Sequence, residues 1–236
     1  MMRILTALGL CVGLTACVVA PVSAPAPVPT ATPAAVSPAA ARARARTFVS
    51  VVNQLEPVAE QECRARTQNL NCDFNIVVDD RPGMPVNAFQ TLDRQGRPII
   101  GFTLALIADA RNEDELAFVL GHEAAHHIAG HIGRQQQNAV AGAVIFAGLA
   151  TLSGGDANAV RSAQELGAQV GARSYSKEFE LEADALGTVI TKRAGYDLLR
   201  GAEFFTRIPD PGDQFLGTHP PNAARVEIVR KTAAGL

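Results

Sequence analysis

The sequence predicts a helix-rich α+β domain with a small β-sheet. Several segments between residues 42 and 236 repeat apolar residues at a helical spacing, whereas only two short segments are typical of β-strands. Residues 42–236 contain no internal repeat and are long enough for one compact domain with a substantial core. Trp is absent and aromatic residues make up 5% of the chain, so we expect an aliphatic core in which phenylalanines are the main large rings.

Apolar spacing and capping residues locate the helices. Phe48, Val51 and Leu55 recur at helical spacing in a segment that runs into the first cysteine of the domain. Asn112 is a typical N-cap, and Glu115 three residues later completes a capping box. We expect helices over residues 48–63, 112–126, 139–152, a stretch ending near 171, 177–193, and from 222 onward.

The two expected strands are residues 73–78 and residues 98–106. The first ends at residues 79–83, whose Asp-Asp-Arg-Pro-Gly sequence is a strong turn signal. Residues 139–152 are apolar and uncharged, yet too short to span a membrane as a helix. We expect them to form either a buried core helix or a mobile cover over a functional site.

The first 41 residues are expected to lie outside the domain. A single charge precedes the apolar run 4–14, which is typical of a secretory signal peptide. The sequence Leu-Thr-Ala-Cys that ends at Cys17 resembles the bacterial lipobox, so we expect residues 1–16 to be removed and Cys17 to carry lipid. An ordinary signal peptide with a chance cysteine is the alternative. Residues 17–41 contain six prolines and should form an extended tether.

Charge and cysteine content restrict the partners and the compartment. The formal net charge is −2 and becomes −3 when Arg3 leaves with the signal peptide, and nothing in the chain suggests nucleic-acid binding. Cys63 and Cys72 are an even pair in an exported chain, so we expect a disulfide. Two reduced, buried thiols are the alternative.

Four of the five histidines lie between residues 122 and 131, in a run whose core is His-Glu-x-x-His. On a helix, His122 and His126 lie one above the other, so both can bind a single metal ion. Glu123 faces the same metal and can take a proton from a metal-bound water. His127 lies on another side of the helix and is expected to be a surface or packing residue. His131 is expected to form structural hydrogen bonds.

A catalytic zinc site uses three protein ligands and leaves one position for water. The best source of the third ligand is residues 177–184, where Glu180 and Asp184 share a helical face and Glu182 points the opposite way. A carboxylate from a second helix is the gluzincin arrangement. The metzincin alternative requires a histidine at position 132, which is occupied by Ile132.

Further short motifs accompany the metal motif. Residues 112–117 read Asn-Glu-Asp-Glu-Leu-Ala, residues 180–184 read Glu-Leu-Glu-Ala-Asp, and the shorter matches are Asn87-Ala88-Phe89, His131, His219-Pro220 and Arg225. In these motifs and in their order, which span residues 87–225, the chain resembles the M48 family of zinc metallopeptidases.

The resemblance implies a zincin-like metallopeptidase fold that binds one Zn²⁺ per chain. It makes Glu180 the third ligand, beside His122 and His126. It also implies that Glu123 acts as general base and then as general acid, while zinc polarises the scissile carbonyl. Asp184, one turn after Glu180, would orient a ligand histidine.

His219 and Arg225 are expected either to stabilise the developing oxyanion or to regulate access to the metal. In some relatives a histidine at this place binds zinc in the resting state, and both roles stay open for His219. By analogy with gluzincin clefts, the strand near residues 98–102 either receives an extended substrate by edge pairing or lies buried inside the sheet.

These expectations describe a lipid-anchored zinc endopeptidase that faces the periplasm and cleaves unfolded or misassembled cell-envelope proteins. Position 18 is Val rather than Asp, and by resemblance to the sorting rules of enterobacterial lipoproteins this favours the outer over the inner membrane. One alternative is a non-proteolytic, zinc-containing lipoprotein that acts as an assembly factor or chaperone with envelope partners. A lipoprotein that acts on cell-wall peptides is another.

Overall fold

The computed structural model describes residues 37–174, 176–212, 214, 217 and 219–236. The expected signal peptide, the lipidation site Cys17 and the tether up to residue 36 lie outside these residues. The first helix, α1 (Pro38–Arg66), begins before the expected end of the tether. The hydroxyl of Ser37 caps it by accepting a hydrogen bond from the amide of Ala40, and Pro38 suits the first helical position because its missing N–H needs no partner there.

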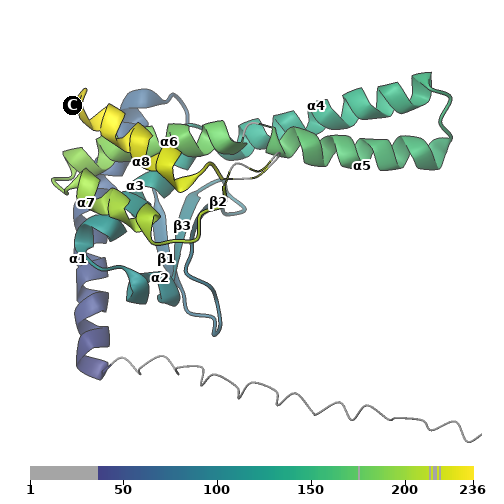
Figure 1. Cartoon of the computed structure of the whole chain (residues 1–236). Helices are drawn as coiled ribbons and strands as arrows, with labels where there is room; N and C mark the ends of the chain where they lie inside the picture. The colour runs from purple at the N-terminus through teal and green to yellow at the C-terminus, as the bar shows by residue number, and fades with distance from the viewer. Residues whose placement is uncertain (1–36, 175, 213, 215–216, 218) are drawn as a thin grey trace, which may run out of the picture. The chain divides into compact units, whose positions relative to one another are not determined.

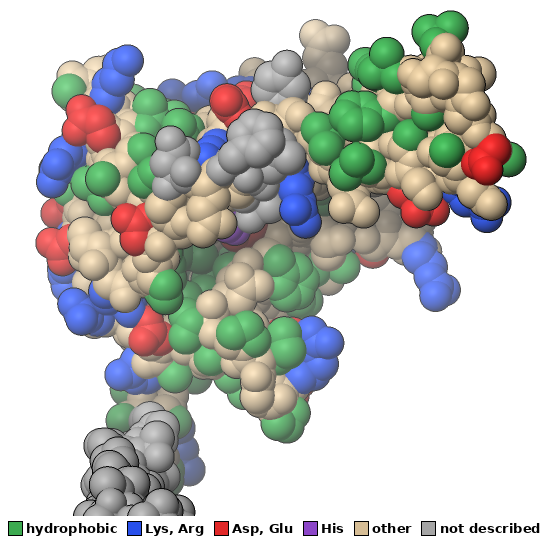
Figure 2. Space-filling view, turned by 45° about the vertical axis from the view of Figure 1, so that its right-hand side comes forward, with side chains coloured by type: hydrophobic (Ala, Val, Ile, Leu, Met, Phe, Trp, Pro, Cys, Tyr) green, Lys and Arg blue, Asp and Glu red, His purple; other side chains and the backbone are tan. Residues whose placement is uncertain are grey.

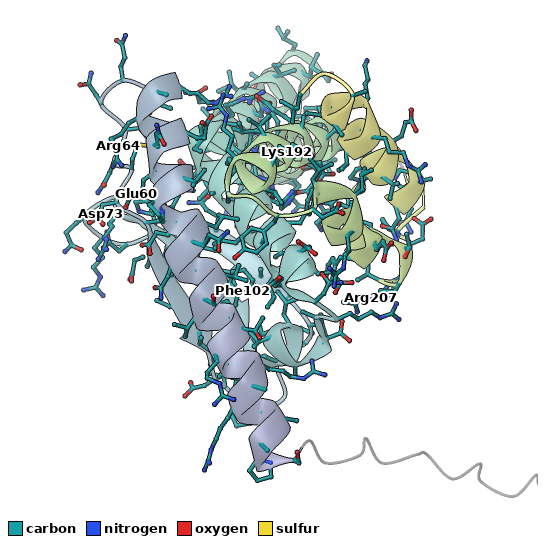
Figure 3. All side chains as sticks on the ribbon, turned by 90° about the vertical axis from the view of Figure 1, so that its left-hand side faces the viewer. Glu60, Arg64, Asp73, Phe102, Lys192 and Arg207 are labelled. Atoms are coloured by element: carbon teal, nitrogen blue, oxygen red, sulfur yellow. A yellow bond between two sulfur atoms is a disulfide. The ribbon has the colours of Figure 1, made fainter. Side chains whose placement is uncertain are left out.

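The long helix α1 lies against the core of the domain (Figure 3). Its apolar face buries Phe48, Val51 and Leu55, as the helical spacing predicts. The ring of Phe48 packs against that of Phe102, with 5.0 Å between the centroids. Helix α1 therefore covers the sheet strand that carries Phe102.

The sheet in the described part of the chain has the order β1–β3–β2. Its strands are β1 (Asn75–Asp79), β2 (Ala88–Leu92) and β3 (Pro98–Thr103), with β3 parallel to β1 and antiparallel to β2. The helix-rich α+β fold with a small sheet is confirmed. β3 is the interior strand of this sheet. Of the two expected roles, edge pairing with a substrate or burial inside the sheet, burial is therefore the correct one.

The expected strand 98–106 is too long by three residues. The chain turns at Thr103, whose hydroxyl accepts a hydrogen bond from the amide of Leu106 and so caps the short helix α2 (Leu104–Asp109). The sequence did not predict β2, which pairs with β3 along its whole length. Gly101 of β3 makes this pairing close, because a Cβ there would lie 2.3 Å from the ring of Phe89.

The remaining helices pack against α1, the sheet or one another (Figure 1). They are α3 (Glu113–Ile128), α4 (His131–Leu152), α5 (Ala157–Arg173), α6 (Ser176–Arg193), α7 (Leu198–Ala202), the 3₁₀ turn η1 (Glu203–Thr206) and α8 (Asn222–Ala233). Asn112 caps α3 as expected, by accepting from the amide of Glu115 at 3.0 Å. The carboxylate of Glu115, however, accepts from the amide of Arg111, one residue earlier than a capping box requires.

Helices α4 and α5 form a hairpin that projects from the domain, and we call residues 131–173 the arm (Figure 1). The expectation of a buried core helix over 139–152 is wrong: within α4, all of which is described, His131 alone is buried. Val140 and Val144 are 64% and 67% exposed, and hydrophobic side chains gather along the arm (Figure 2). Nor does the segment lie over the rest of the domain in Figure 1. No described helix is long and apolar enough to cross a bilayer.

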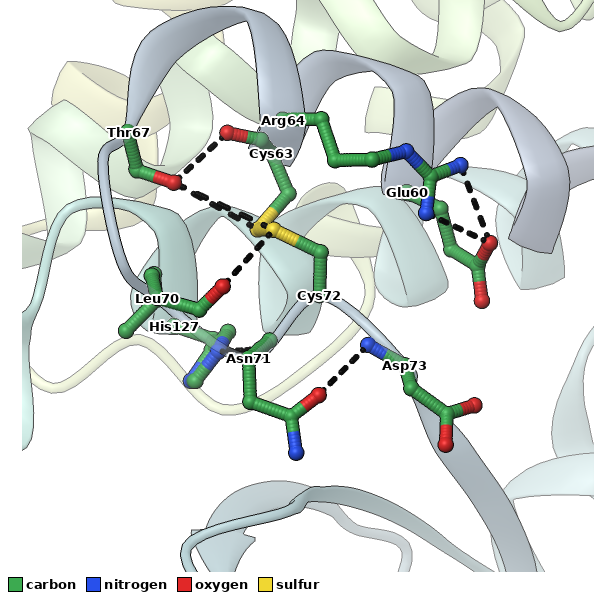
Figure 4. Close-up of a disulfide and its surroundings, with 9 residues drawn as sticks. All are labelled: Glu60, Cys63, Arg64, Thr67, Leu70, Asn71, Cys72, Asp73 and His127. Carbon is green, nitrogen blue, oxygen red and sulfur yellow. Dashed lines mark hydrogen bonds and ion pairs between the residues drawn. A yellow bond between two sulfur atoms is a disulfide. The ribbon is translucent and has the colours of Figure 1, made fainter.

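A disulfide joins Cys63, near the end of α1, to Cys72 (Figure 4). The loop that it closes presents the carbonyl of Asn71 to Nε2 of His127 at 2.7 Å. The ring of His127 also packs edge-on against Phe74. His127 is therefore the packing residue that its helical position predicts, and it connects the disulfide loop to α3.

Candidate metal centre

Two glycines bring α3 and α6 into backbone contact. A Cβ at Gly187 of α6 would lie 2.9 Å from the amide nitrogen of His122, and a Cβ at Gly121 of α3 would lie 3.0 Å from the carbonyl oxygen of Gly187. Larger residues would therefore separate the helices. Glu180 and Asp184 precede Gly187 by about two turns and one turn, so they face the histidines of α3.

His122, His126 and Glu180 form the one group among the described residues that could hold a metal ion. Nε2 of His122 lies 3.0 Å from Nε2 of His126 and 3.6 Å from Oε2 of Glu180, and Nε2 of His126 lies 3.3 Å from Oε1 of Glu180. Tetrahedral ligands at zinc distances of about 2.0–2.1 Å are separated from one another by about 3.3 Å. The three side chains therefore fit such an ion.

Behind His122 lies a buried ion pair. Nδ1 of His122 is 2.9 Å from Oδ1 of Asp184, and Arg225 donates two hydrogen bonds to the same carboxylate, at 2.7 and 2.8 Å. The guanidinium of Arg225 also lies over the ring of Phe205. Burial raises the pKa of Asp184, but the hydrogen bonds from Arg225 and His122 outweigh it and lower the pKa overall. Asp184 is thus an ionised acceptor that fixes the ring of His122.

Behind His126 lies a different set of groups. Nδ1 of His126 is 2.8 Å from Nδ1 of His131, and Nε2 of His131 is 3.2 Å from Oε2 of Glu182. Arg134 donates to the same oxygen of Glu182 at 2.7 Å. Burial, with the nearby charge of His126, lowers the pKa of His131 to about 4, although Glu182 opposes the shift. His131 forms the structural hydrogen bonds expected of it.

Glu180 collects several of these groups around one carboxylate. Nδ1 of His219 lies 3.2 Å and Nη2 of Arg225 lies 3.5 Å from its Oε2 atom. Burial raises the pKa of Glu180, but hydrogen bonds from His126 and His219, together with the charge of His122, hold this pKa well below its usual range. The side chain of His219 is 56% exposed, so it reaches Glu180 from the solvent side.

Two cavities open beside the cluster, and a histidine is visible at the bottom of a hollow in Figure 2. The smaller cavity encloses about 210 Å³ and the larger about 460 Å³. Glu123, His126, Glu180 and His219 line both of them. Glu123 therefore borders the same open space as His126 and Glu180.

Comparison with known proteins identifies the family to which this site belongs. Residues 46–233 match Peptidase family M48. The chain belongs to Peptidase family M48. This match covers the His122–His126–Glu180 group and the residues behind it, and it confirms the resemblance that the short motifs indicate.

The M48 domain is also similar to curated proteins. It is 31% identical over 145 residues to a putative beta-barrel assembly-enhancing protease of Vibrio cholerae, which amounts to 54% of this chain and 29% of that protein. It is 32% identical over 151 residues to the beta-barrel assembly-enhancing protease of Yersinia pestis, at 55% and 29% coverage. The protein of that name in Escherichia coli O157:H7 is 31% identical over 155 residues. The chain thus spans less than a third of the length of these relatives.

In this M48 domain the predicted site residues come together in one place. The structure places His122, Glu123, His126, Glu180, Asp184, His219 and Arg225 around the two cavities or directly behind the ligands. Sequence reasoning missed the contacts of Glu182 and Arg134, and it missed the close packing at Gly187. A lone glycine inside a helical pattern signals such packing, whereas the orientation of His131 that engages Glu182 leaves no mark in the sequence.

Proposed function

We propose that this M48 peptidase is a zinc metalloendopeptidase that cleaves unfolded or misassembled cell-envelope proteins. The observation that carries the proposal is the His122–His126–Glu180 group, with Glu123 lining the cavities beside it. Two imidazoles and one carboxylate suit zinc, and a site with three protein ligands leaves a position for water. The similarity to beta-barrel assembly-enhancing proteases supports a role in the assembly of envelope proteins.

The chemistry follows from the residues that surround this group. His122, His126 and Glu180 would hold zinc, which would act there as a Lewis acid toward the scissile carbonyl and a bound water. Glu123 takes the proton of the attacking water and delivers it to the leaving amine. Asp184 keeps His122 in a fixed orientation through Nδ1 of the ring, and Arg225 holds the carboxylate of Asp184 in place.

An extended polypeptide is the substrate form that fits the surroundings. β2 lies at an edge of the described sheet, and residues 88 and 90 of this strand line the larger and the smaller cavity. An edge strand can pair with an extended chain through its backbone. The larger cavity is lined mainly by apolar side chains, including Leu106, Phe118, Val119, Phe204, Phe205 and Ile208. It suits an apolar substrate residue, and unfolded proteins expose such residues.

The proposed location rests on the sequence ahead of the domain. The signal-like residues 1–16 and the lipobox-like cysteine at position 17 support a lipoprotein that faces the periplasm, with the outer membrane favoured by Val18. The disulfide between Cys63 and Cys72 agrees with an oxidising compartment. The membrane contact and the envelope partners of the protein are parts of this proposal.

The test is replacement of the proposed general base. Glu123→Gln keeps the size and polarity of the side chain but removes its ability to take a proton. We expect zinc to remain at one ion per chain while cleavage of unfolded casein falls about 10²–10⁴-fold. Zinc content is measured by atomic emission, and cleavage by release of labelled peptide with and without a chelator.

Glu178 is an exposed glutamate on the same helix as Glu180, so Glu178→Gln is the matched control. We expect this variant to cleave casein at the wild-type rate. Full cleavage by Glu123→Gln would contradict the mechanism. A wild-type protein that binds zinc but cleaves nothing would favour the non-proteolytic assembly factor, and cleavage of peptidoglycan peptides alone would favour the cell-wall enzyme.

A further inference from the structure

The two ligand histidines are supported in different ways. His122 meets a carboxylate directly through Nδ1, which is 2.9 Å from Asp184. Among the residues that the structure describes, no carboxylate meets Nδ1 of His126; its neighbour at 2.8 Å is another imidazole nitrogen, Nδ1 of His131. Two ring nitrogens at this distance form a hydrogen bond only if one carries a proton and the other is bare. The arrangement of protons is therefore restricted.

Counting protons gives a single arrangement for a metal-binding His126. Its Nε2 faces the metal group and must be bare to bind an ion, so the proton of the ring is on Nδ1. Nδ1 of His131 then accepts this proton's hydrogen bond, and the proton of His131 lies on Nε2. That nitrogen donates to Glu182 at 3.2 Å. A series of two hydrogen bonds thus runs from His126 through His131 to the carboxylate of Glu182.

His131 and Glu182, at the far end of this series of hydrogen bonds, are held in place by further contacts. Arg134 donates to Glu182 at 2.7 Å, and the ring of His131 stacks on that of Phe179 with the planes 12° apart and the centroids 4.7 Å apart. His131 is 5% exposed, so a ring nitrogen left without a partner would be costly. These contacts leave His131 little freedom to turn away from His126.

We propose that His131 and Glu182 are positioning residues that fix the ring orientation and the protonated nitrogen of His126 for zinc binding. The proposal rests on the proposed metal site and adds a second carboxylate support to it, one imidazole further from the ion than Asp184. Residues that orient a ligand histidine in this way typically change metal affinity 10–100-fold.

The test measures zinc affinity by competition with a chelator, together with the absorption spectrum of the Co²⁺ form. His131→Phe keeps the stack on Phe179 but leaves Nδ1 of His126 without an acceptor. We expect zinc to bind about 10–100-fold more weakly, with an altered Co²⁺ spectrum. In His131→Asn an amide oxygen can take the place of Nδ1, so this variant should recover much of the loss.

His127→Phe is the matched control, because His127 is equally buried and packs on Phe74 but hydrogen-bonds to the carbonyl of Asn71 instead of a ligand. We expect it to lower thermal stability and leave zinc affinity unchanged. Zinc affinity of His131→Phe within twofold of the wild type, or an equal loss in His127→Phe, would overturn the proposal.

Glu182→Ala keeps the test decisive if His131→Phe does not fold, because Glu182 is a half-exposed side chain. We expect a several-fold loss of zinc affinity, and none in Glu178→Ala on the same helix. Equal affinities in these two variants would remove Glu182 from the proposal. A wild-type protein that binds no zinc would instead contradict the proposed metal site itself, so the two failures are distinguishable.

Discussion

At the scale of single residues, the carboxylate of Glu180, a proposed metal ligand, has several positively charged or imidazole side chains around it. Two histidines of α3, one arginine of α8 and the half-exposed His219 all approach its carboxylate. His219 lies in the stretch before α8, and it lines both cavities. It therefore occupies space beside the His122–His126–Glu180 group, in the cavities where the proposed mechanism places a substrate carbonyl.

Replacement of His219 tests whether it restricts this entry. We expect His219→Ala to raise kcat/KM several-fold on unfolded substrate, because the change uncovers the carboxylate of Glu180 and widens both cavities. The measurement is initial cleavage rate against substrate concentration. Gln214→Ala, an exposed residue of the same stretch, should have no effect. A fall in kcat for His219→Ala would assign this histidine to oxyanion stabilisation instead.

The clustering of the proposed ligands could be predicted from the sequence because the geometry within each pair is local. His122 and His126 are one helical turn apart, and Glu180 and Asp184 share a face of a second helix, so spacing alone brings each pair together. The partner of Glu182 could not be predicted. Its contact with His131 depends on how α4 leaves the end of α3, and that direction is set by tertiary packing.

At the scale of elements, the two helices of the arm approach each other closely at glycines, while several of its large apolar residues stay exposed. A Cβ at Gly167 would lie 2.2 Å from the carbonyl oxygen of Gly142, and one at Gly171 would lie 2.0 Å from that of Asn138. The two backbones therefore touch. Val140, Val144, Ile145, Leu149 and Leu152 are more than half exposed, so the packing of the hairpin does not bury them.

Gly167→Val should open the arm without disturbing the metal group. Overpacking of this kind costs about 1–3 kcal/mol of folding stability. The strain would affect α4 and α5, whereas the proposed ligands lie on α3 and α6. Hydrogen exchange should become faster over residues 139–170, with zinc affinity unchanged. Gly148→Val, in open space on the same hairpin, is the control and should exchange normally. Loss of zinc in Gly167→Val would show that the arm supports the site.

Sequence patterns predicted where the helices lie better than what they contact. Residues 139–152 were expected to be helical and are, but apolar composition does not reveal whether a partner lies within the same domain. β2 escaped prediction because it is five residues long and all but one of them are only partly buried, which gives no clear alternation. Its position at the sheet edge follows only from the pairing with β3.

At the scale of the whole molecule, the disulfide joins the end of the first helix to the loop that contacts α3. It closes the loop in which Asn71 accepts a hydrogen bond from His127 of α3 (Figure 4). The chain segments that it joins would otherwise be free to separate when the domain unfolds. The bridge therefore stabilises the native domain mainly by restricting its unfolded state.

Replacing both Cys63 and Cys72 with serine should lower the free energy of unfolding by somewhat under about 3 kcal/mol, since the closed loop is short. For a domain of this size the loss corresponds to a fall in Tm of about 5–10 °C. Calorimetry measures both quantities. Dithiothreitol should lower the Tm of the wild type by the same amount and leave that of the double variant unchanged. If neither reduction of the wild type nor the double substitution lowered the Tm, the bridge would add no stability.

The arm also offers a site for attaching a probe at a distance from the metal group. Its two helices meet the domain side by side, where Asn138 faces Gly171, and from there α4 extends roughly 20 Å to a turn at residues 153–156. Exposed turns of small residues tolerate insertion. A fluorophore or spin label attached at this turn would report the distance and angle of the domain to a bilayer or a bound chain, while the metal group stays chemically untouched.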